Sequence, residues 1–211
     1  TLDTNGKMSL TSDAVAVKPT ATIVIASSTS RGKDAADYVC DGTNDEVQIQ
    51  AAIDALGVEG GTICLLEGTY TIAAVITIDK RITITGQQSG DKGGGTKLVL
   101  ANAADCDMFD LVPAVGASTT HYQLTRFEHL MLDGNKANQT AATKAIDQNE
   151  GSAVDLTLYD IWFDSWKGYC IDLQQYWDWH IFRCVFEHND TYAIHLEHVN
   201  NHAPTTGWIK D

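Results

Sequence analysis

The chain has 211 residues, of which 44% are hydrophobic and 20% are charged, a composition typical of a folded protein with one sizeable core. Its 28 acidic residues outnumber 14 Lys and Arg, and the net charge of -14 disfavours nucleic acid and anionic lipid as partners. No apolar run approaches the roughly 20 residues that span a bilayer, so we expect no membrane span. Five cysteines, an odd number without CxxC spacing, support neither a disulfide framework nor a zinc site, and we expect free thiols.

The N-terminal part of the chain predicts an arm, a strand and a helix. Residues 1–20 have few large apolar side chains and are expected to form an arm or linker. Residues 21–58 begin with the β-branched run ATIVIA, which predicts a strand. Thr43 and Glu46 then have the spacing of a capping box, and apolar residues recur after them at helical spacing until a glycine. We therefore expect a helix over 44–56 that covers a hydrophobic surface.

Residues 59–211 predict short strands that repeat. Residues 154–174 align with residues 177–197 at a constant offset of 23, and Ile146 precedes Ile171 by 25. Within each repeat the apolar residues alternate, shift phase once and alternate again, which is expected for a sharp bend between two strands. A repeat of this length without a helix fits one coil of a parallel β-helix, whose N-terminal end the predicted helix would cap.

Three polar residues fall at the phase shift of successive repeats. They are His129, Asp160 and Arg183, and we expect them to form a ladder that stabilises the bend. The chain ends in TTGWIKD, which reads as the start of another strand. We therefore expect the coils to be truncated there or continued by a further C-terminal domain or a partner subunit.

Two stretches resemble a known superfamily. DGTNDEVQIQAAIDAL, followed by GGTICLLEGTYTI, resembles the N-terminal capping segment of the pectate-lyase-like (pectin lyase-like) right-handed parallel β-helix proteins, and FEHLMLDGNK and LYDIWFDS resemble their coils. The resemblance covers roughly residues 37–211 and implies an all-β solenoid of three-strand coils with an N-terminal capping α-helix. The superfamily includes polysaccharide lyases, glycoside hydrolases, epimerases, phage tailspikes and non-catalytic surface proteins, so the fold does not specify the activity.

The alternation also predicts which polar side chains point outward from the coils. If Ile146, Ile171 and Ile194 point inward, one outward column contains Asp147, Asp172 and His195, and a second contains Asn149, Gln174 and Glu197. Neighbours in a column lie about 4.8 Å apart, where two carboxylates can act as acid and base or share a divalent cation such as Ca²⁺. We predict Asp147 and Asp172 as the catalytic or metal-binding pair, His195 as a proton shuttle, Glu197 in support, and Asn149 and Gln174 as substrate-binding residues. The alternative is that an acidic chain carries these residues on its surface by chance.

Aromatic residues form a second group of candidates. Trp162, Trp166, Tyr176 and Trp177 are close in sequence, and the alternation places Trp162 and Trp166 outside the core. Exposed aromatic faces can stack on sugar rings, so we predict substrate binding. The alternative is that they cover loops or pack against a neighbouring subunit.

The sequence therefore supports two hypotheses. In the first, an extracellular, cell-surface or virion β-helix domain binds polysaccharide and could cleave it, as a lyase or glycoside hydrolase, by carboxylate chemistry on its outer face. In the second, the coils form a non-catalytic module, such as a phage tailspike or surface stalk, with an oligomer interface and a homotrimeric assembly.

Overall fold

The computed structural model of the chain describes residues 22–89, 94–112, 123–148, 154–174, 176–197 and 207–210. These residues form an all-β structure with one short α-helix, α1 (Glu46–Ala55), and two short 3-10 turns, η1 (Lys33–Ala35) and η2 (Lys136–Asn138). The strands are β1 (Thr22–Ala26), β2 (Tyr38–Val39), β3 (Gly61–Leu65), β4 (Gly68–Ile72), β5 (Ile76–Ile78), β6 (Ile82–Thr85), β7 (Thr96–Leu100), β8 (Phe109–Leu111), β9 (Gln123–Asp133), β10 (Ile146–Gln148), β11 (Val154–Asp164), β12 (Ile171–Leu173), β13 (Tyr176–Phe182), β14 (Val185–Glu187), β15 (Ile194–Leu196) and β16 (Gly207–Lys210).

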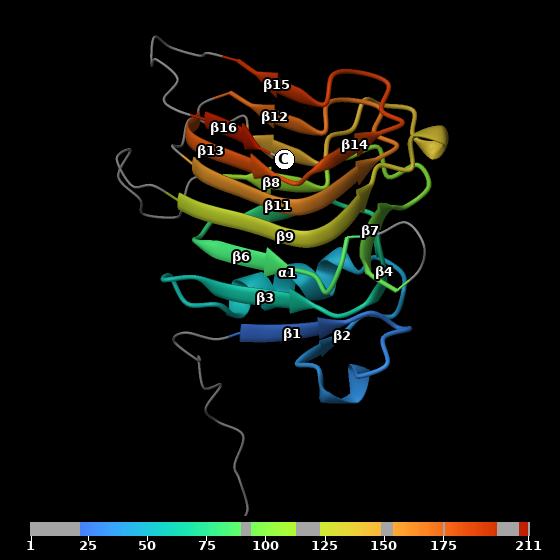
Figure 1. Ribbon diagram of the computed structural model, residues 1–211. Coiled ribbons are helices and arrows are strands. Elements are labelled where there is room, and N and C mark those ends of the chain that lie inside the picture. Colours follow the sequence, from blue (N-terminus) through green and yellow to red (C-terminus); the bar gives the residue numbers. More distant parts are fainter. Residues whose placement is uncertain are drawn as a thin grey trace, which may run out of the picture.

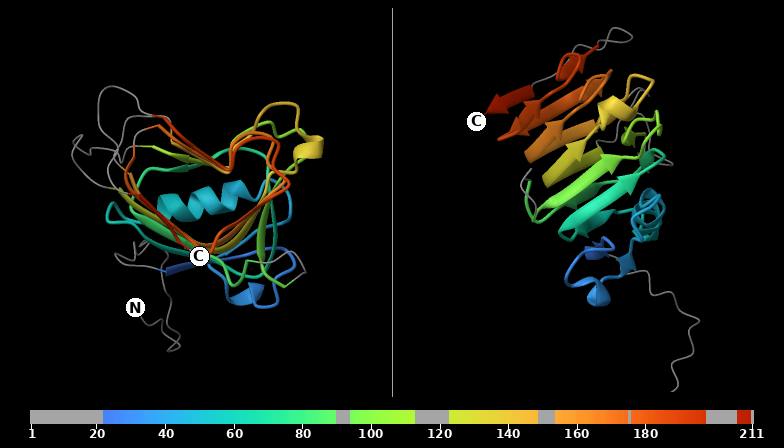
Figure 2. Two further views of the ribbon diagram at one scale, coloured as in Figure 1. Left: turned by 45° about the horizontal axis from the view of Figure 1, so that its top comes forward. Right: turned by 90° about the vertical axis from the view of Figure 1, so that its right-hand side faces the viewer.

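The strands build two parallel sheets. The larger sheet has eleven strands, with the order β16-β13-β11-β9-β6-β3-β1-β2 and with β4, β7 and β14 joined at its side. The smaller sheet has five strands, in the order β15-β12-β10-β8-β5. Successive passes of the chain lie one above another, from the α1 end of the stack to β15 and β16 (Figures 1 and 2). This arrangement confirms the predicted parallel strands and is compatible with a solenoid.

The repeat offset read from the sequence is the register of the sheets. Leu158 lies opposite Ile181 and Ile171 lies opposite Ile194, both at the predicted offset of 23. Ile146 lies opposite Ile171, at the predicted offset of 25. Because a one-residue slip would turn every apolar side chain out of the core, the buried face fixes this register.

The predicted bend is also present. His129, Asp160 and Arg183 have positive φ angles of 55°, 55° and 51°, a conformation that sharply turns a strand and that few side chains adopt. His129 Nδ1 lies 2.8 Å from Asp160 Oδ2, so two residues of the expected ladder are in contact. The guanidinium carbon of Arg183 lies 6.0 Å from the centre of the Tyr159 ring.

The helix closes one end of the core. Figure 2 (left) shows α1 lying across the opening that the strands enclose, and its residues Ile49, Ala52 and Ile53 are fully buried. The predicted capping box is wrong, and the helix starts at Glu46 with Asp45 in the N-cap position. The reason is that the side chains of the predicted box bind elsewhere: Thr43 Oγ1 donates to Asp41 Oδ1 at 2.8 Å, and Glu46 Oε2 accepts from Ala73 N at 2.9 Å.

Two expectations from composition can be compared with the structure. All five cysteines are free, as predicted. Among the described residues, no helix has the length and apolar character needed to cross a bilayer.

Candidate functional site

The predicted Asp147 column lies on the outer face of the five-stranded sheet. Asp147 on β10, Asp172 on β12 and His195 on β15 are direct neighbours in the register. The column continues on the other side to Asp110 on β8. Parallel pairing at one strand spacing therefore brings four titratable side chains from four passes of the chain into one row. We call these four residues the acidic column.

A lysine that was not among the predicted site residues forms ion pairs with two members of the acidic column. Lys144, two residues before β10, places its Nζ 2.8 Å from Asp147 Oδ1 and 2.8 Å from Asp172 Oδ2. The side chains of both aspartates are only 5% and 6% exposed. Burial of this kind is tolerated when the charges are paired. The ammonium group thus lies between the two carboxylates that were predicted to share a cation.

The charge state of Asp172 follows from these contacts. Burial opposes ionisation, but hydrogen bonds from Lys144 and His195, with their positive charges, outweigh it and lower the pKa of Asp172 below its ordinary value. The same two aspartates raise the pKa of Lys144 against the effect of its burial. Asp172 is therefore a carboxylate at neutral pH, and its chemistry is that of an acceptor, not of a general acid.

His195 is a partly exposed member of the acidic column. Its Nδ1 lies 2.7 Å from Asp172 Oδ1, and its side chain is 34% exposed. The ring of Tyr169 stacks on the imidazole, with 4.4 Å between the ring centres and 10° between the planes. An imidazole held at one nitrogen by a buried carboxylate has a fixed orientation.

A protonatable carboxyl group lies at the other end of the column. Asp107, two residues before β8, accepts a hydrogen bond from Lys144 N at 2.7 Å. Burial is the main cause that raises the pKa of Asp107 to about 6, and the charges of Asp147 and Asp110 act in the same direction. Three strand spacings, about 14 Å, separate the β8 end of the column from His195, so the two groups are too far apart to act on one bond.

The second predicted column is less informative. Gln174 N and Glu197 N each donate to a main-chain carbonyl of the preceding pass, at 3.0 Å from Gln148 O and Leu173 O respectively. Glu197 is exposed and Gln174 is half-buried. Asn149 lies outside the described residues.

The aromatic predictions need one correction. Trp166, expected outside the core, is fully buried, and its Nε1 donates to Leu132 O at 3.0 Å. The alternation failed because Ser165, directly before it, has a φ of 56°, which turns the chain and ends the period of two. Trp162 is half-buried. Only the backbone of Tyr176 and Trp177 is described, within β13.

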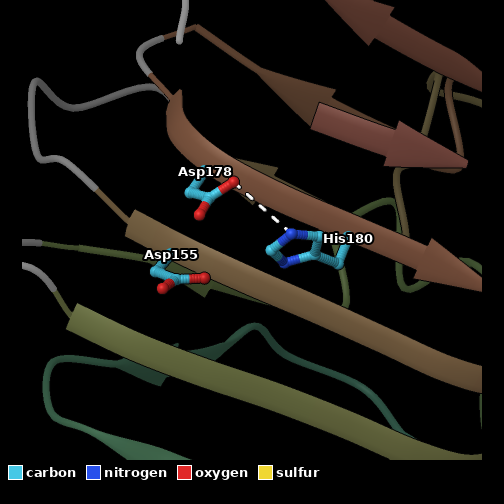
Figure 3. A group of neighbouring side chains, drawn as sticks. All are labelled: Asp155, Asp178 and His180. Carbon is cyan, nitrogen blue, oxygen red and sulfur yellow. Dashed lines mark ion pairs between the residues drawn. The ribbon is translucent and has the colours of Figure 1, made fainter. Parts of the chain in front are cut away.

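A second polar site, which was not predicted, lies on the outer face of the larger sheet. A hollow of about 390 Å³ lies over β3, β6, β9 and β11 and is lined by polar side chains that include Arg81, Arg126, Thr83 and Asp155. At its β11 rim, Asp155 lies close to Asp178 and His180 of β13 (Figure 3). The sequence contained a signal for this group, because the offset of 23 already places Asp155 over Asp178.

No protein-family model matches the chain, and no significant match is found among curated proteins or among solved structures.

Proposed function

We propose that the chain is a right-handed parallel β-helix domain, similar to the pectate-lyase-like proteins, that binds a surface or extracellular polysaccharide along the outer face of its five-stranded sheet. The observation that carries this proposal is the partly exposed His195, held by the ionised Asp172 at 2.7 Å and stacked on Tyr169. A flat aromatic ring beside hydrogen-bonding groups is a suitable surface for a sugar.

The same geometry supports a cleavage step. His195 would take a proton from the attacking water molecule or from the sugar, and the Asp172 carboxylate would stabilise the imidazolium that forms. As the C–O bond to the leaving sugar breaks, the imidazolium would return the proton to the leaving oxygen. Lys144 keeps Asp172 ionised and fixes its position through the contact with Oδ2 at 2.8 Å. In this mechanism His195 takes the acid and base role that was predicted for Asp147 and Asp172, because Asp172, with its lowered pKa, is a poor proton donor.

The test is a cleavage screen of the purified chain. Neutral and acidic polysaccharides are incubated with and without Ca²⁺, and new reducing ends and the ultraviolet absorbance of unsaturated uronates are recorded. Reducing ends alone indicate hydrolysis, and both signals together indicate a lyase. The variant His195→Gln should reduce the rate by about 10²- to 10⁴-fold, the range for loss of a general base.

A matched control is available in His188. Its Nδ1 lies 2.8 Å from Asp164 Oδ1, and its side chain is 70% exposed, so it has the same contact with an aspartate in a different place. His188→Gln should cleave like the parent chain. Equal rates in the parent and in His195→Gln would refute the catalytic part of the proposal. If the chain neither binds nor cleaves any of the polysaccharides, the whole proposal is refuted.

A second candidate function is a structural module. Trp208 and Ile209 on β16 are each 63% exposed, and apolar side chains on an outer strand are typical of an interface. In this alternative, copies of the chain associate through this strand. Light scattering distinguishes the candidates: a trimer that Trp208→Ser dissociates favours the module, whereas a monomer with His195-dependent cleavage favours the enzyme.

A further inference from the structure

Three metal-ligating side chains converge on the outer face of the larger sheet. Asp178 and His180 are two residues apart on β13, so they point to the same side of the strand. Asp155 lies opposite Asp178 on the neighbouring strand β11. One ligand atom from each of the three side chains lies within 4.8 Å of the other two, and Figure 3 shows the three side chains on one side of the two strands. We call them the Asp-Asp-His cluster.

The hollow beside this cluster is an independent feature of the same face. Asp155 belongs to both, since it also lines the hollow of about 390 Å³. Thr157, which lies opposite His180, also lines the hollow, and Arg126 and Thr83 extend the lining to β9 and β6. A cation at the cluster would thus have protein ligands on one side and open space on the other, where water or a ligand oxygen could complete its coordination.

The charges of the cluster favour a bound cation. Asp155 and Asp178 bring two carboxylates together from paired positions on neighbouring strands. The imidazole gives limited compensation, because its Nε2 is 3.5 Å from Asp178 Oδ1. A divalent ion between the two carboxylates would balance their charge fully.

We propose that Asp155, Asp178 and His180 bind a divalent transition metal ion, with Zn²⁺ as the representative, and that an open coordination position faces the hollow. Two carboxylate oxygens and one imidazole nitrogen form a three-ligand set of the kind that leaves a fourth position open. The imidazole selects against Ca²⁺, which takes oxygen ligands. Ligand atoms of a tetrahedral zinc site lie about 3.3 Å apart, so small rotations of these partly exposed side chains would close the site.

The site does not depend on the proposed polysaccharide function, because it lies on a different sheet from His195. The ion pair between His180 and Asp178 would be exchanged for bonds to the metal, which requires the neutral imidazole. Zinc bound there would also link β11 to β13 and stabilise the folded chain, since the unfolded chain does not hold the three ligands together.

The experiment is a metal titration of the full chain, stripped with chelator, at neutral pH. Calorimetry with ZnCl₂ should give one tight site per chain, and CaCl₂ should bind at least about tenfold more weakly. His180→Gln and Asp155→Asn should each weaken Zn²⁺ binding by at least about tenfold and remove the rise in Tm that Zn²⁺ causes. Circular dichroism of each variant without metal checks that it is folded.

The control variant is His188→Gln, which removes a histidine that contacts an aspartate but lies outside the cluster. It should bind Zn²⁺ like the parent. Binding that persists in both His180→Gln and Asp155→Asn would place the ion elsewhere, for example on the half-buried thiols of Cys64, Cys106 and Cys184, and would overturn the proposal. The absence of any Zn²⁺ binding, or preferential binding of Ca²⁺, would overturn it as well.

Discussion

Replacement of Lys144 by methionine tests how the acidic column is held together. The change keeps the length and apolar stem of the side chain but removes the ammonium group that contacts Asp147 Oδ1 and Asp172 Oδ2, both at 2.8 Å. The two carboxylates lose their shared cation while they remain almost fully buried. Removing one partner of a buried ion pair costs about 3–5 kcal/mol. We expect Lys144→Met to lower the free energy of unfolding by about 3 kcal/mol at neutral pH, because the lysine is itself partly exposed.

The pH dependence of this loss has a defined sign. In the parent chain the pKa of Asp172 is lowered in the folded state, so the stability it contributes is present above the unfolded pKa of about 3.9 and disappears as the pH falls through the folded value. Without Lys144, burial is expected to raise the pKa of Asp172 in the folded state instead. The variant should therefore recover stability, relative to the parent, as the pH falls toward about 4.

Urea unfolding at several pH values, followed by circular dichroism, measures both effects. The control is Lys136→Met, which removes an exposed ion pair with Asp190 at 2.7 Å and should cost no more than about 1 kcal/mol. If Lys144→Met and Lys136→Met lose the same stability at neutral pH, or if the loss in Lys144→Met grows on acidification, the account of the column is wrong.

Two further predictions concern burial. Trp166→Phe removes an indole N–H that donates to a main-chain carbonyl at 3.0 Å and should lower the free energy of unfolding in urea by about 1–3 kcal/mol. Trp162→Phe should be nearly neutral, because Trp162 Nε1 is buried without a hydrogen-bond partner among the described residues. Equal losses in the two variants would contradict the different roles of the two indole groups. The pKa of Asp107 is raised to about 6 in the folded state, so the parent loses stability as the pH rises through that value. Asp107→Asn should remove this pH dependence and stabilise the chain at neutral pH by on the order of 1 kcal/mol after allowance for solvent screening. If Asp107→Asn is less stable than the parent at neutral pH, the raised pKa of Asp107 is refuted.

The sequence was sufficient for the features that repeat. Strand pairing places equivalent residues of successive passes side by side, so the offset of 23 between Ile171 and Ile194 could be read directly as register. The phase shift at Asp160 gave the bend, because an inward and outward alternation can change phase only where the backbone turns. Regular stacking thus makes strand neighbours predictable from one sequence.

Most of the features that were not predicted lie in the connections between strands, outside the repeating strand pattern. Lys144 and Trp166 are in connecting segments, where no period tells which way a side chain points. Asp107 is also in a connection, and its pKa depends on burial that alternation does not describe. The Asp-Asp-His cluster was predictable from the sequence, because the offset of 23 places Asp155 beside Asp178 and Thr157 beside His180 on the neighbouring strand.

The most direct test of the central claim is to map where an oligosaccharide contacts the chain. Amide chemical shifts of the ¹⁵N-labelled protein would be followed while oligosaccharides from the cleavage screen are titrated into the parent chain and into the His195→Gln variant. In the variant, cleavage should be lost and binding should be weaker. The account predicts that the perturbed amides are those of β10, β12 and β15 and of the residues around Lys144 and Tyr169. Perturbations confined to β9, β11 and β13, or their complete absence with every sugar, would contradict it.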